Sequence, residues 1–382
     1  MASGAQRRIK SISYAKYGYL FILPFFLVYF FFQLWPLINT FILSFKDFTG
    51  ENSVGLANYK ALFKGVGTEP MNFSDGSTFK IADRTARVVH ENFLSAFKNT
   101  VILWIGNFIP QIALSLSLAV WFTDAQLKIP GKGFFKIVMY LPNIITAASV
   151  AVLFLQLCGE AENVPGSLKY LPNIITAVSV AALFMRFISN SQLSAVNTLL
   201  LNAGNDAVSF EASAVWSRGI VMFIQTWLWF GNTMIMLMSG IQGINPSLFE
   251  AASIDGATSG QVFRKITFPL LSPIMAYTLV TSMIGGLQMF DIPYLYHKDP
   301  NHTSENLKTV AVYIYEYFYD QTDPKLGFAG TASVLLFLVT LILGCIAFYL
   351  TRDKDAIAKK KQRKKIAKQN KRESKQFGGF TI

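Results

Sequence analysis

The chain has 382 residues, a formal net charge of +12 and a mean hydropathy of +0.38, and only 15% of its residues are charged. Soluble domains average about 25% charged residues, so this composition excludes an ordinary soluble protein. Several apolar runs exceed the roughly 20 residues that a helix needs to cross a bilayer. The sequence therefore predicts an all-α integral membrane protein with several spans.

Most of the positive charge lies in one C-terminal segment. Residues 352–375 contain twelve Lys/Arg and three Asp/Glu, a net charge of +9. Because this segment follows an apolar run, we interpret it as a cytoplasmic flank that contacts membrane lipid, not as a nucleic-acid site. The two cysteines, Cys158 and Cys345, provide neither a disulfide framework nor a CxxC metal site. No cofactor and no metal are expected.

The first span is predicted at residues 19–43. Its apolar run is too long for a cleavable signal peptide, and basic residues before it place residues 1–18 in the cytoplasm. Residues 45–99 are rich in Gly, Asn and Asp, and we expect them to form an extracytoplasmic loop. A second span at 100–122 then returns the chain to the cytoplasm.

A near-exact repeat follows. YLPNIITAASVAVLF at residues 140–154 recurs as YLPNIITAVSVAALF at residues 170–184, with thirteen of fifteen positions identical. An uninterrupted apolar run covers residues 134–157, whereas the second copy soon meets Arg186. Whether one or both copies cross the membrane depends on the topology of the rest of the chain.

Three further spans are predicted beyond the repeat, at residues 218–241, 273–296 and 328–350. The transmembrane domain would therefore cover residues 19–351, followed by a basic tail at 352–382. Residues 245–272, between two of these spans, are amphipathic and too polar to cross a bilayer. We expect them to form a compact knob outside the membrane on which a partner docks.

Helix signals divide this knob into two short helices. Asn245 is the expected N-cap, with Pro246 at the first helical position and a capping box at residues 247–250. Gly256 is expected to take the left-handed conformation that ends the first helix. Thr258 or Ser259 would then cap a second helix that runs through residue 265.

The stretch EAASIDGATSGQVFRKITFPLLSP resembles the signature loop of the membrane subunits of binding-protein-dependent ABC importers. That signature has Glu-Ala-Ala, then Asp-Gly-Ala, then Ile-x-Leu-Pro, and Phe268 stands here where Leu is usual. The stretches at 54–63, 93–103, 288–296 and 327–343 also resemble family segments, and the closest subgroup is the sugar-type permease. The matching loop residues are Glu250, Ala251, Ala252, Asp255, Gly256, Ala257, Ile266 and Pro269.

The resemblance implies a six-span permease bundle whose loop at 245–272 couples it to a cytoplasmic ATPase dimer. It also implies a second permease subunit, an extracytoplasmic solute-binding (lipo)protein and a sugar-like solute. Glu250 would either cap the helix alone or both cap it and contact the ATPase. The chain has no GxxxxGK[ST] phosphate-binding loop and no recognisable catalytic cluster, so it is predicted to be a transport subunit, not an enzyme. The alternative is a secondary transporter or scaffold without an ATPase.

Polar residues within the spans are candidates for the substrate path. Gln225, Trp229 and Asn232 recur at one helical face, where amides and an indole suit a sugar, and the resemblance supports this position. Gly286, Gln288 and Met289 in the next span are further candidates. The competing interpretation is helix–helix hydrogen bonding and packing within the bundle.

Topology limits the repeat to one crossing. With the N-terminus and the coupling loop both cytoplasmic, an even number of spans must precede residue 245. Two crossings in the repeat would place the loop and the basic tail outside, so one crossing gives six spans in the plasma membrane with both termini cytoplasmic. We expect the first copy to span and the second to pack outside or re-enter, with the reverse assignment and a sequence-level duplication as alternatives.

Overall fold

The computed structural model of the chain describes residues 15–74, 76, 78–124, 127, 130–140, 184, 187–188, 192, 194–210, 213–296, 305–320, 325–350 and 362–367. Most of these residues are helical, and their only paired strands form the short antiparallel hairpin β1 (Met71–Asn72) and β2 (Thr78–Phe79). Five helical segments in this part of the chain are long and apolar enough to cross a membrane: Gly18–Ser44, Asp83–Thr123, Ala214–Gln242, Ser259–Leu295 and Leu326–Tyr349. An all-α membrane protein is therefore confirmed.

These five segments correspond to the five spans predicted outside the repeat. The largest difference is α4 (Asp83–Thr123), which has 41 residues and begins well before the predicted start at residue 100. Ala86, Val89, Phe93 and Ala96 are buried at helical spacing, so an amphipathic stretch extends the span on its N-terminal side. At 1.5 Å per residue α4 is about 60 Å long, twice the thickness of a bilayer core of about 30 Å.

The sixth predicted span lies almost entirely outside the described residues. Residues 132–140 are helical and include the start of the run predicted at 134–157. Both copies of the repeat, except for residues 140 and 184, fall outside the described ranges, as do residues 351–361 and 368–382 of the tail. The assignment of the crossing copy thus stays a prediction.

The described residues divide into two compact units. The first contains those up to Glu91 together with Ile314–Leu335, and the second contains those of Asn92–Tyr313 and from Leu336 onward. Three helices continue from one unit into the other: α4, α13 (Val310–Tyr319) and α14 (Leu326–Leu350).

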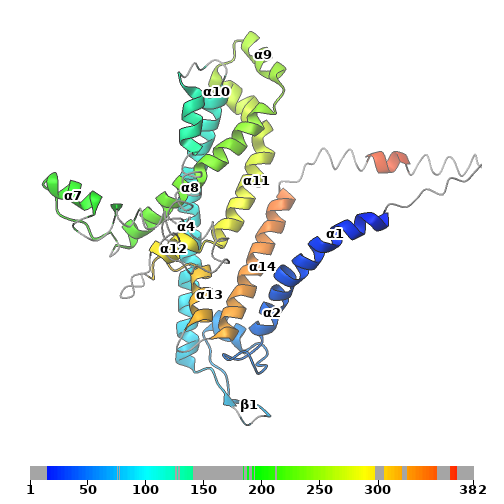
Figure 1. The fold of residues 1–382 in the computed structure, drawn as a ribbon, viewed down its shortest axis with the longest axis vertical. Coiled ribbons are helices and arrows are strands. Elements are labelled where there is room, and N and C mark those ends of the chain that lie inside the picture. The colour runs from blue at the N-terminus through cyan, green and yellow to red at the C-terminus, as the bar shows by residue number, and fades with distance from the viewer. Residues whose placement is uncertain are drawn as a thin grey trace, which may run out of the picture. The chain divides into compact units, whose positions relative to one another are not determined.

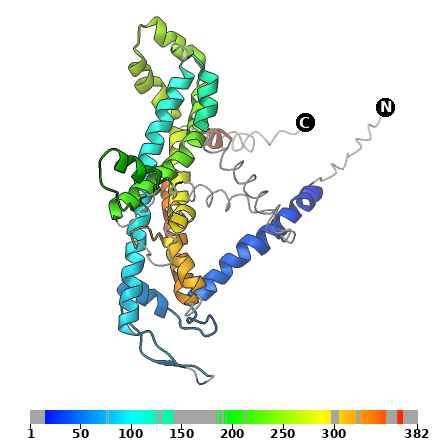
Figure 2. The same ribbon diagram turned by 60° about the vertical axis from the view of Figure 1, so that its left-hand side comes forward.

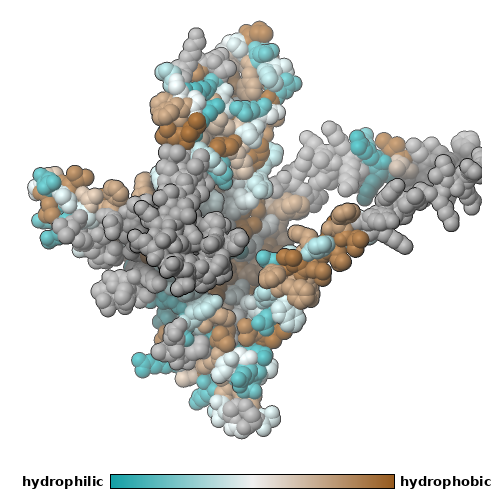
Figure 3. Space-filling model, in the orientation of Figure 1, coloured by the Kyte–Doolittle hydropathy of each residue, from teal (hydrophilic) through white to brown (hydrophobic). Residues whose placement is uncertain are grey.

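The first unit begins with a span that has almost no neighbours. It consists of α1 (Ala15–Tyr29), the π-helical turn η1 (Phe30–Leu34) and α2 (Trp35–Ser44). None of its most apolar window is buried, and α1 shows mainly hydrophobic side chains in Figure 3. This surface is left for lipid or another chain to cover.

Polar contacts close the first unit beyond this span. The Ser44 carbonyl accepts hydrogen bonds from Asn58 Nδ2 of α3 (Ala57–Lys64) and from Thr331 Oγ1 of α14, at 3.2 and 3.1 Å. A Cβ at Gly327 would collide with the Lys46 carbonyl, and one at Gly330 would lie 2.9 Å from the Ser44 nitrogen. Glycine thus allows α14 to meet the end of α2 closely.

Asp47 organises the turn after α2. Its carboxylate accepts hydrogen bonds from Thr49 Oγ1 and from the Gly50 and Glu51 N–H groups, at 2.8 to 3.0 Å. Burial raises the pKa of this carboxyl, but the hydrogen bonds from Thr49, the Glu51 N–H and Asn52 outweigh that effect and leave the pKa below its ordinary value. The turn is therefore stabilised by an ionised aspartate.

In the second unit, α4 and α8 (Ala214–Gln242) are joined by a polar seam within an apolar interface. Gln111 Nε2 donates to Thr233 Oγ1 at 2.8 Å, and Ser115 Oγ donates to the Phe230 carbonyl at 2.7 Å. Thr226 Oγ1 donates to the Asn107 carbonyl at 3.1 Å. Asn107, Gln111 and Ser115 recur every four residues and are buried, so they mark the α4 face that packs on α8.

The next span, α11 (Phe268–Leu287), packs against α4 and α8 at small residues. A Cβ at Gly240 of α8 would collide with the side chains of Leu271 and Ile274, and one at Gly286 would collide with the Trp104 ring of α4. Trp104 Nε1 also donates to Ser282 Oγ at 3.3 Å. A short helix, α12 (Asp291–Tyr296), follows α11.

The predicted knob is present at the end of α8 and α11 (Figures 1 and 2). It consists of α9 (Pro246–Ile254), α10 (Ser259–Val262) and the π-helical turn η3 (Phe263–Thr267), which leads into α11. The Ser247 N–H donates to Asn245 Oδ1 at 3.1 Å, and Gly256 has φ +70°, so the predicted N-cap and left-handed stop are confirmed.

Two details of the predicted knob are wrong. Residues 247–250 form no capping box, because Asn245 already caps α9 and Ser247 lies inside the helix. The capping box lies instead at the second helix, between Thr258 and Gln261. That helix does not stop at residue 265 but continues through η3 into the span. Pro269 follows directly on this π-helical turn, in which the Phe268 N–H donates to the Phe263 carbonyl, and the helix continues past the missing N–H of the proline.

Candidate functional site

The first helix of the knob, α9, presents an apolar face to its surroundings. Leu248, Ala251 and Ile254 recur every three residues and are exposed, and Ile254 has 87% of its surface accessible. Ala252 is the one buried residue of α9. Figure 3 shows hydrophobic and hydrophilic residues side by side at this end of the molecule. α9 therefore gives the knob an apolar contact surface that the rest of the chain does not cover.

Acidic residues flank this face. Glu250 and Asp255 are both exposed, and neither side chain has a hydrogen bond or ion pair with another residue in the described ranges. Since Asn245 caps α9, capping does not account for Glu250. Gly256 has open space around its Cα, so its positive φ, and not a close neighbour, makes glycine the favoured residue there.

The remaining signature residues lie in the second half of the knob. Ala257 is half-buried, and its N–H donates to the Ala252 carbonyl at 2.9 Å, which closes the turn after α9. Ile266 is half-buried in η3, and Pro269 is exposed at the start of α11. These residues join the knob to the span and do not extend the apolar face of α9.

The candidate substrate-path residues do not gather in one pocket. Trp229 and Asn232 are exposed on α8, whereas Gln225 on the same helical face is 8% exposed. Gly286 is buried beneath Trp104, which explains this glycine by close helix packing. Met289 is buried among apolar residues. Only Gln288 of the six lines the groove described next.

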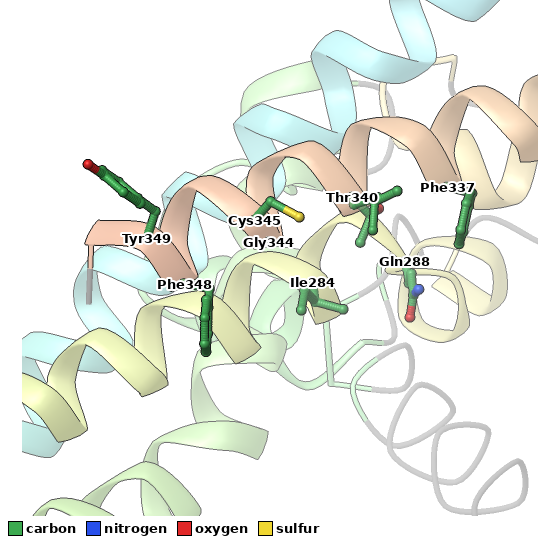
Figure 4. Close-up of a pocket in the computed structure, with 9 residues that line it drawn as sticks. Ile284, Gln288, Phe337, Thr340, Gly344, Cys345, Phe348 and Tyr349 are labelled. Atoms are coloured by element: carbon green, nitrogen blue, oxygen red, sulfur yellow. The ribbon is translucent and has the colours of Figure 1, made fainter. Parts of the chain in front are cut away.

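A groove of about 580 Å³ runs between α11 and α14 within the second unit (Figure 4). Ile284 and Gln288 come from α11 and its C-cap, and the opposite wall is formed by α14. The lining is apolar apart from a few polar groups, of which Thr340 donates to the Leu336 carbonyl. The wall residues from α14 are Phe337, Thr340, Leu341, Gly344, Cys345, Phe348 and Tyr349.

Sequence reasoning missed two polar groups of residues that the structure brings together. One is the α4–α8 seam, although Asn107, Gln111 and Ser115 at intervals of four residues were a readable signal. The other joins Asn99 and Arg218 to residues 305–308, which no local spacing could reveal. Among the described residues, no group of His, Cys, Asp and Glu is arranged to hold a metal ion.

Residues 100–354 match the family of inner membrane components of binding-protein-dependent transport systems. This match covers well over half of the chain, and the chain belongs to that family. It is a membrane-embedded transport subunit and not an enzyme. The alternative of a secondary transporter or scaffold is thereby set aside.

Relatives match along nearly the whole length. The lactose transport system permease protein LacF of Rhizobium radiobacter is 24% identical over 93% of this chain and 100% of its own length. The arabinooligosaccharides transport system permease protein AraP of Bacillus subtilis is 25% identical over 87% of this chain and 88% of its own length.

A crystal structure of a bacterial ABC transporter that imports the acidic polysaccharide alginate has the same fold. One of its chains is 23% identical, with a TM-score of 0.67, over 90% of this chain and 97% of that one. A chain of a bacterial alginate ABC transporter in complex with an alginate pentasaccharide-bound periplasmic protein is also 23% identical, with a TM-score of 0.66. These matches identify the fold as that of an ABC importer permease.

Proposed function

We propose that this chain is one of two permease subunits of an ATP-driven sugar importer, and that it meets the ATPase through α9. The relatives are named for lactose and for arabinooligosaccharides, which supports a sugar or oligosaccharide as the solute. Because the chain has no phosphate-binding loop, ATP must be bound by a separate cytoplasmic ATPase dimer.

The single observation that carries the proposal is the exposed apolar face of α9. Burying apolar surface contributes roughly 25 cal/mol per Å², so leaving Ile254 and Leu248 in water is unfavourable unless a partner covers them. The flanking carboxylates of Glu250 and Asp255 would pair with basic groups at the edge of such a contact. α9 has the size and rigidity to move as one piece with the ATPase and to transmit its closure to the spans.

The proposed orientation places both termini and the knob in the cytoplasm. The basic residues before the first span and the net +9 of residues 352–375 support it. The second permease subunit and lipid would cover the exposed span at Gly18–Ser44. The solute-binding protein would dock on the extracytoplasmic side of the membrane, opposite the knob. A cysteine introduced at Ser374 should react with an impermeant maleimide only after the cells are permeabilised.

The proposed sugar path uses Trp229, Asn232 and Gln288. An exposed amide in the middle of a membrane-spanning helix must face a water-filled path or a partner, because lipid offers it no hydrogen bond. An exposed indole beside it suits the C–H face of a sugar ring. Gln225, Gly286 and Met289 would support these residues from within the bundle.

The docking proposal is tested by Ile254→Asp, with Leu199→Asp as the matched control. Both residues are strongly exposed aliphatics on short helices, but Leu199 lies on α7 (Ala195–Asn202), away from the knob in the sequence. Each variant would be purified from its own cells through a tag on this chain. We expect Ile254→Asp to lose the co-purified ATPase by about tenfold or more, while Leu199→Asp retains it. Equal recovery from both variants would contradict the proposal.

The solute is tested by uptake of a panel of radiolabelled mono- and oligosaccharides into cells with and without this chain. Asn232→Ala should raise the half-saturating concentration for the transported sugar, because a buried hydrogen bond to a hydroxyl is lost. Asn205→Ala, in the exposed segment after α7, is the control and should transport normally. Failure of every sugar in the panel, with intact ATPase assembly, would overturn the proposed solute class.

A further inference from the structure

A short segment, Glu305–Val310, is fastened to three helices of the second unit by buried polar groups. Asn99 of α4 is 1% exposed, and its Nδ2 donates to the Glu305 carbonyl at 2.6 Å and to the Lys308 carbonyl at 3.2 Å. The Val310 N–H donates to Thr100 Oγ1, the next α4 side chain, at 3.0 Å. Two adjacent residues of α4 thus hold both ends of this segment.

Arg218 of α8 completes the arrangement from the other side. Its Nη2 donates to Asn99 Oδ1 at 2.7 Å and to Asn306 Oδ1 at 3.4 Å, and its Nε donates to the Asn306 carbonyl at 3.2 Å. No carboxylate among the described residues lies within ion-pair distance of Arg218. This half-buried guanidinium is therefore used for its planar set of donors, which a lysine cannot reproduce.

The same segment is tied to the end of α11. Thr309 Oγ1 donates to the Met289 carbonyl at 2.7 Å, just beyond the C-terminus of that helix. Beneath it, Leu307 packs in an apolar cluster with Leu103 of α4, Met289, Ile292 of α12 and three residues of α8: Ile220, Val221 and Ile224. One segment therefore fixes the end of α11 that is farthest from the knob.

We propose that Arg218 and Asn99 are positioning residues, which hold Glu305–Val310 as a fixed anchor for the far end of α11. This inference rests on the proposed coupling of the knob to an ATPase. η3 joins the knob directly to one end of α11, and α11 extends over about 30 Å. When the ATPase moves the knob, α11 turns about its anchored end and changes the sugar path beside it. If that end were not anchored, the helix would slide along its axis instead.

The hydrogen-bonding arrangement favours a permanent anchor over a latch that opens in each cycle. The Asn99 amide uses both its oxygen and its nitrogen, and its partners include two backbone carbonyls. Opening would leave the half-buried guanidinium, the buried Asn99 amide and the buried hydroxyls of Thr100 and Thr309 without these partners, which is unfavourable in a low-dielectric surrounding. The segment and the ends of α4, α8 and α11 should therefore move together.

The first experiment compares Arg218→Lys with Arg84→Lys, a control at an exposed arginine in the first turn of α4. The complex would be purified through this chain with Cys158 and Cys345 replaced by Ala and a single cysteine at Ser272, an exposed residue near the knob end of α11, where a turn about the anchored end displaces the helix most. The readout is the change in maleimide labelling of that cysteine caused by ATP, magnesium and vanadate. We expect Arg218→Lys to reduce this change by about tenfold while the thermal midpoint and ATP hydrolysis are retained.

If Arg218→Lys loses thermal stability, ATP hydrolysis and the labelling change together, the role of Arg218 is merely structural and the inference is overturned. A labelling change equal to that of the unmodified complex would also overturn it. Absence of any ATPase from the unmodified complex would instead overturn the proposed function, on which the anchor depends. The two failures are thus distinguishable.

A second variant keeps the inference falsifiable if Arg218→Lys does not fold. Thr100→Cys with Val310→Cys joins the segment to α4 covalently, where the Val310 N–H and Thr100 Oγ1 are already in contact. If the anchor is permanent, the oxidised complex hydrolyses ATP at the rate of the reduced one. Inhibition on oxidation that dithiothreitol reverses would show that the segment must open, and would contradict the proposal.

Discussion

The two ends of α11 differ in the exposure of the residues around them. At its N-terminal end, the knob exposes Ile254 and the carboxylates of Glu250 and Asp255, which have no partner among the described residues. Just beyond its C-terminal end, Thr309 and Asn99 are buried and hydrogen-bonded, and Leu307 fills an apolar cluster. One end has exposed contact groups, which we propose that another molecule covers, and the other end satisfies its groups within the chain.

This difference indicates how a transport subunit divides its tasks. Exposed apolar surface at a rigid, well-capped helix is unfavourable in an isolated chain and is explained by a partner. A polar network whose donors and acceptors are already paired offers no free group to a partner, but it holds the helix ends in fixed positions. The comparison predicts that changes near the knob affect assembly, whereas changes near the anchored end act within this chain, on its packing or on its coupling, and leave assembly intact.

The largest effect is expected at Gly256. Gly256→Val places a β-branched residue at φ +70°, which strains the turn and reorients α9, so we expect about tenfold less ATPase in the purified complex. Gly256→Asn is the matched control, because asparagine tolerates the left-handed region. Quantitative immunoblotting of the co-purified ATPase measures the difference. Equal losses in both variants would show that strain at this turn is not the cause.

A smaller effect is expected near the anchored end, where Gly286 and Gly285 are adjacent but differ in their surroundings. A Cβ at Gly286 collides with Trp104, whereas one at Gly285 meets nothing within 4 Å. Gly286→Ala should therefore destabilise the protein by about 1–3 kcal/mol through overpacking, and Gly285→Ala should be neutral or slightly stabilising. Thermal unfolding in detergent measures both. Equal midpoints would show that α11 does not press on α4 at this point.

The polar seam of α4 and α8 should contribute less. Hydrogen bonds between membrane helices average about 0.6 kcal/mol, with a maximum near 1.7. We expect a coupling energy in this range from a double-mutant cycle of Gln111→Leu and Thr233→Val, measured by unfolding in detergent. A cycle that closes to zero would mean that apolar packing alone joins these helices.

The smallest effect is a pH dependence in the turn of Asp47. Because its pKa is lowered in the folded chain, the stabilisation is fully present above the ordinary value of 3.8 and is lost as the pH falls through the lower folded value. Protease sensitivity of residues 45–56 should rise over that acid range in the unmodified protein. Asp47→Asn should be more sensitive at pH 7 and show a flatter profile, and an unchanged profile would contradict the assignment.

Local signals in the sequence predicted local features well. Asn245 acts through its side-chain cap and Pro246 and Gly256 act through their own backbones, so the start and the stop of α9 were readable from residue type alone. The spans followed from uninterrupted apolar runs. The early start of α4 was missed because its first turns are amphipathic, and the continuation of α10 into the span was missed because prolines near a helix start look like breaks.

Contacts between distant residues were not readable. Asn99 and Arg218 are 119 positions apart, and Arg218 and Asn306 are 88 apart, so no periodicity connects them. Gly286 was predicted as a substrate-path residue, yet the Trp104 ring of α4 occupies the space beside its Cα. Gln225, Trp229 and Asn232 do share a helical face, but only packing decided that the first is buried and the other two are exposed.

The most direct test of the central claim is a photo-crosslinker placed at position 254 in the intact, membrane-embedded complex, with one at position 199 for comparison. We predict an adduct at 254 with a subunit that contains a phosphate-binding loop, identified by mass spectrometry, and no such adduct at 199. An absence of ATPase adducts at 254, or equal adducts at both positions, would contradict the account.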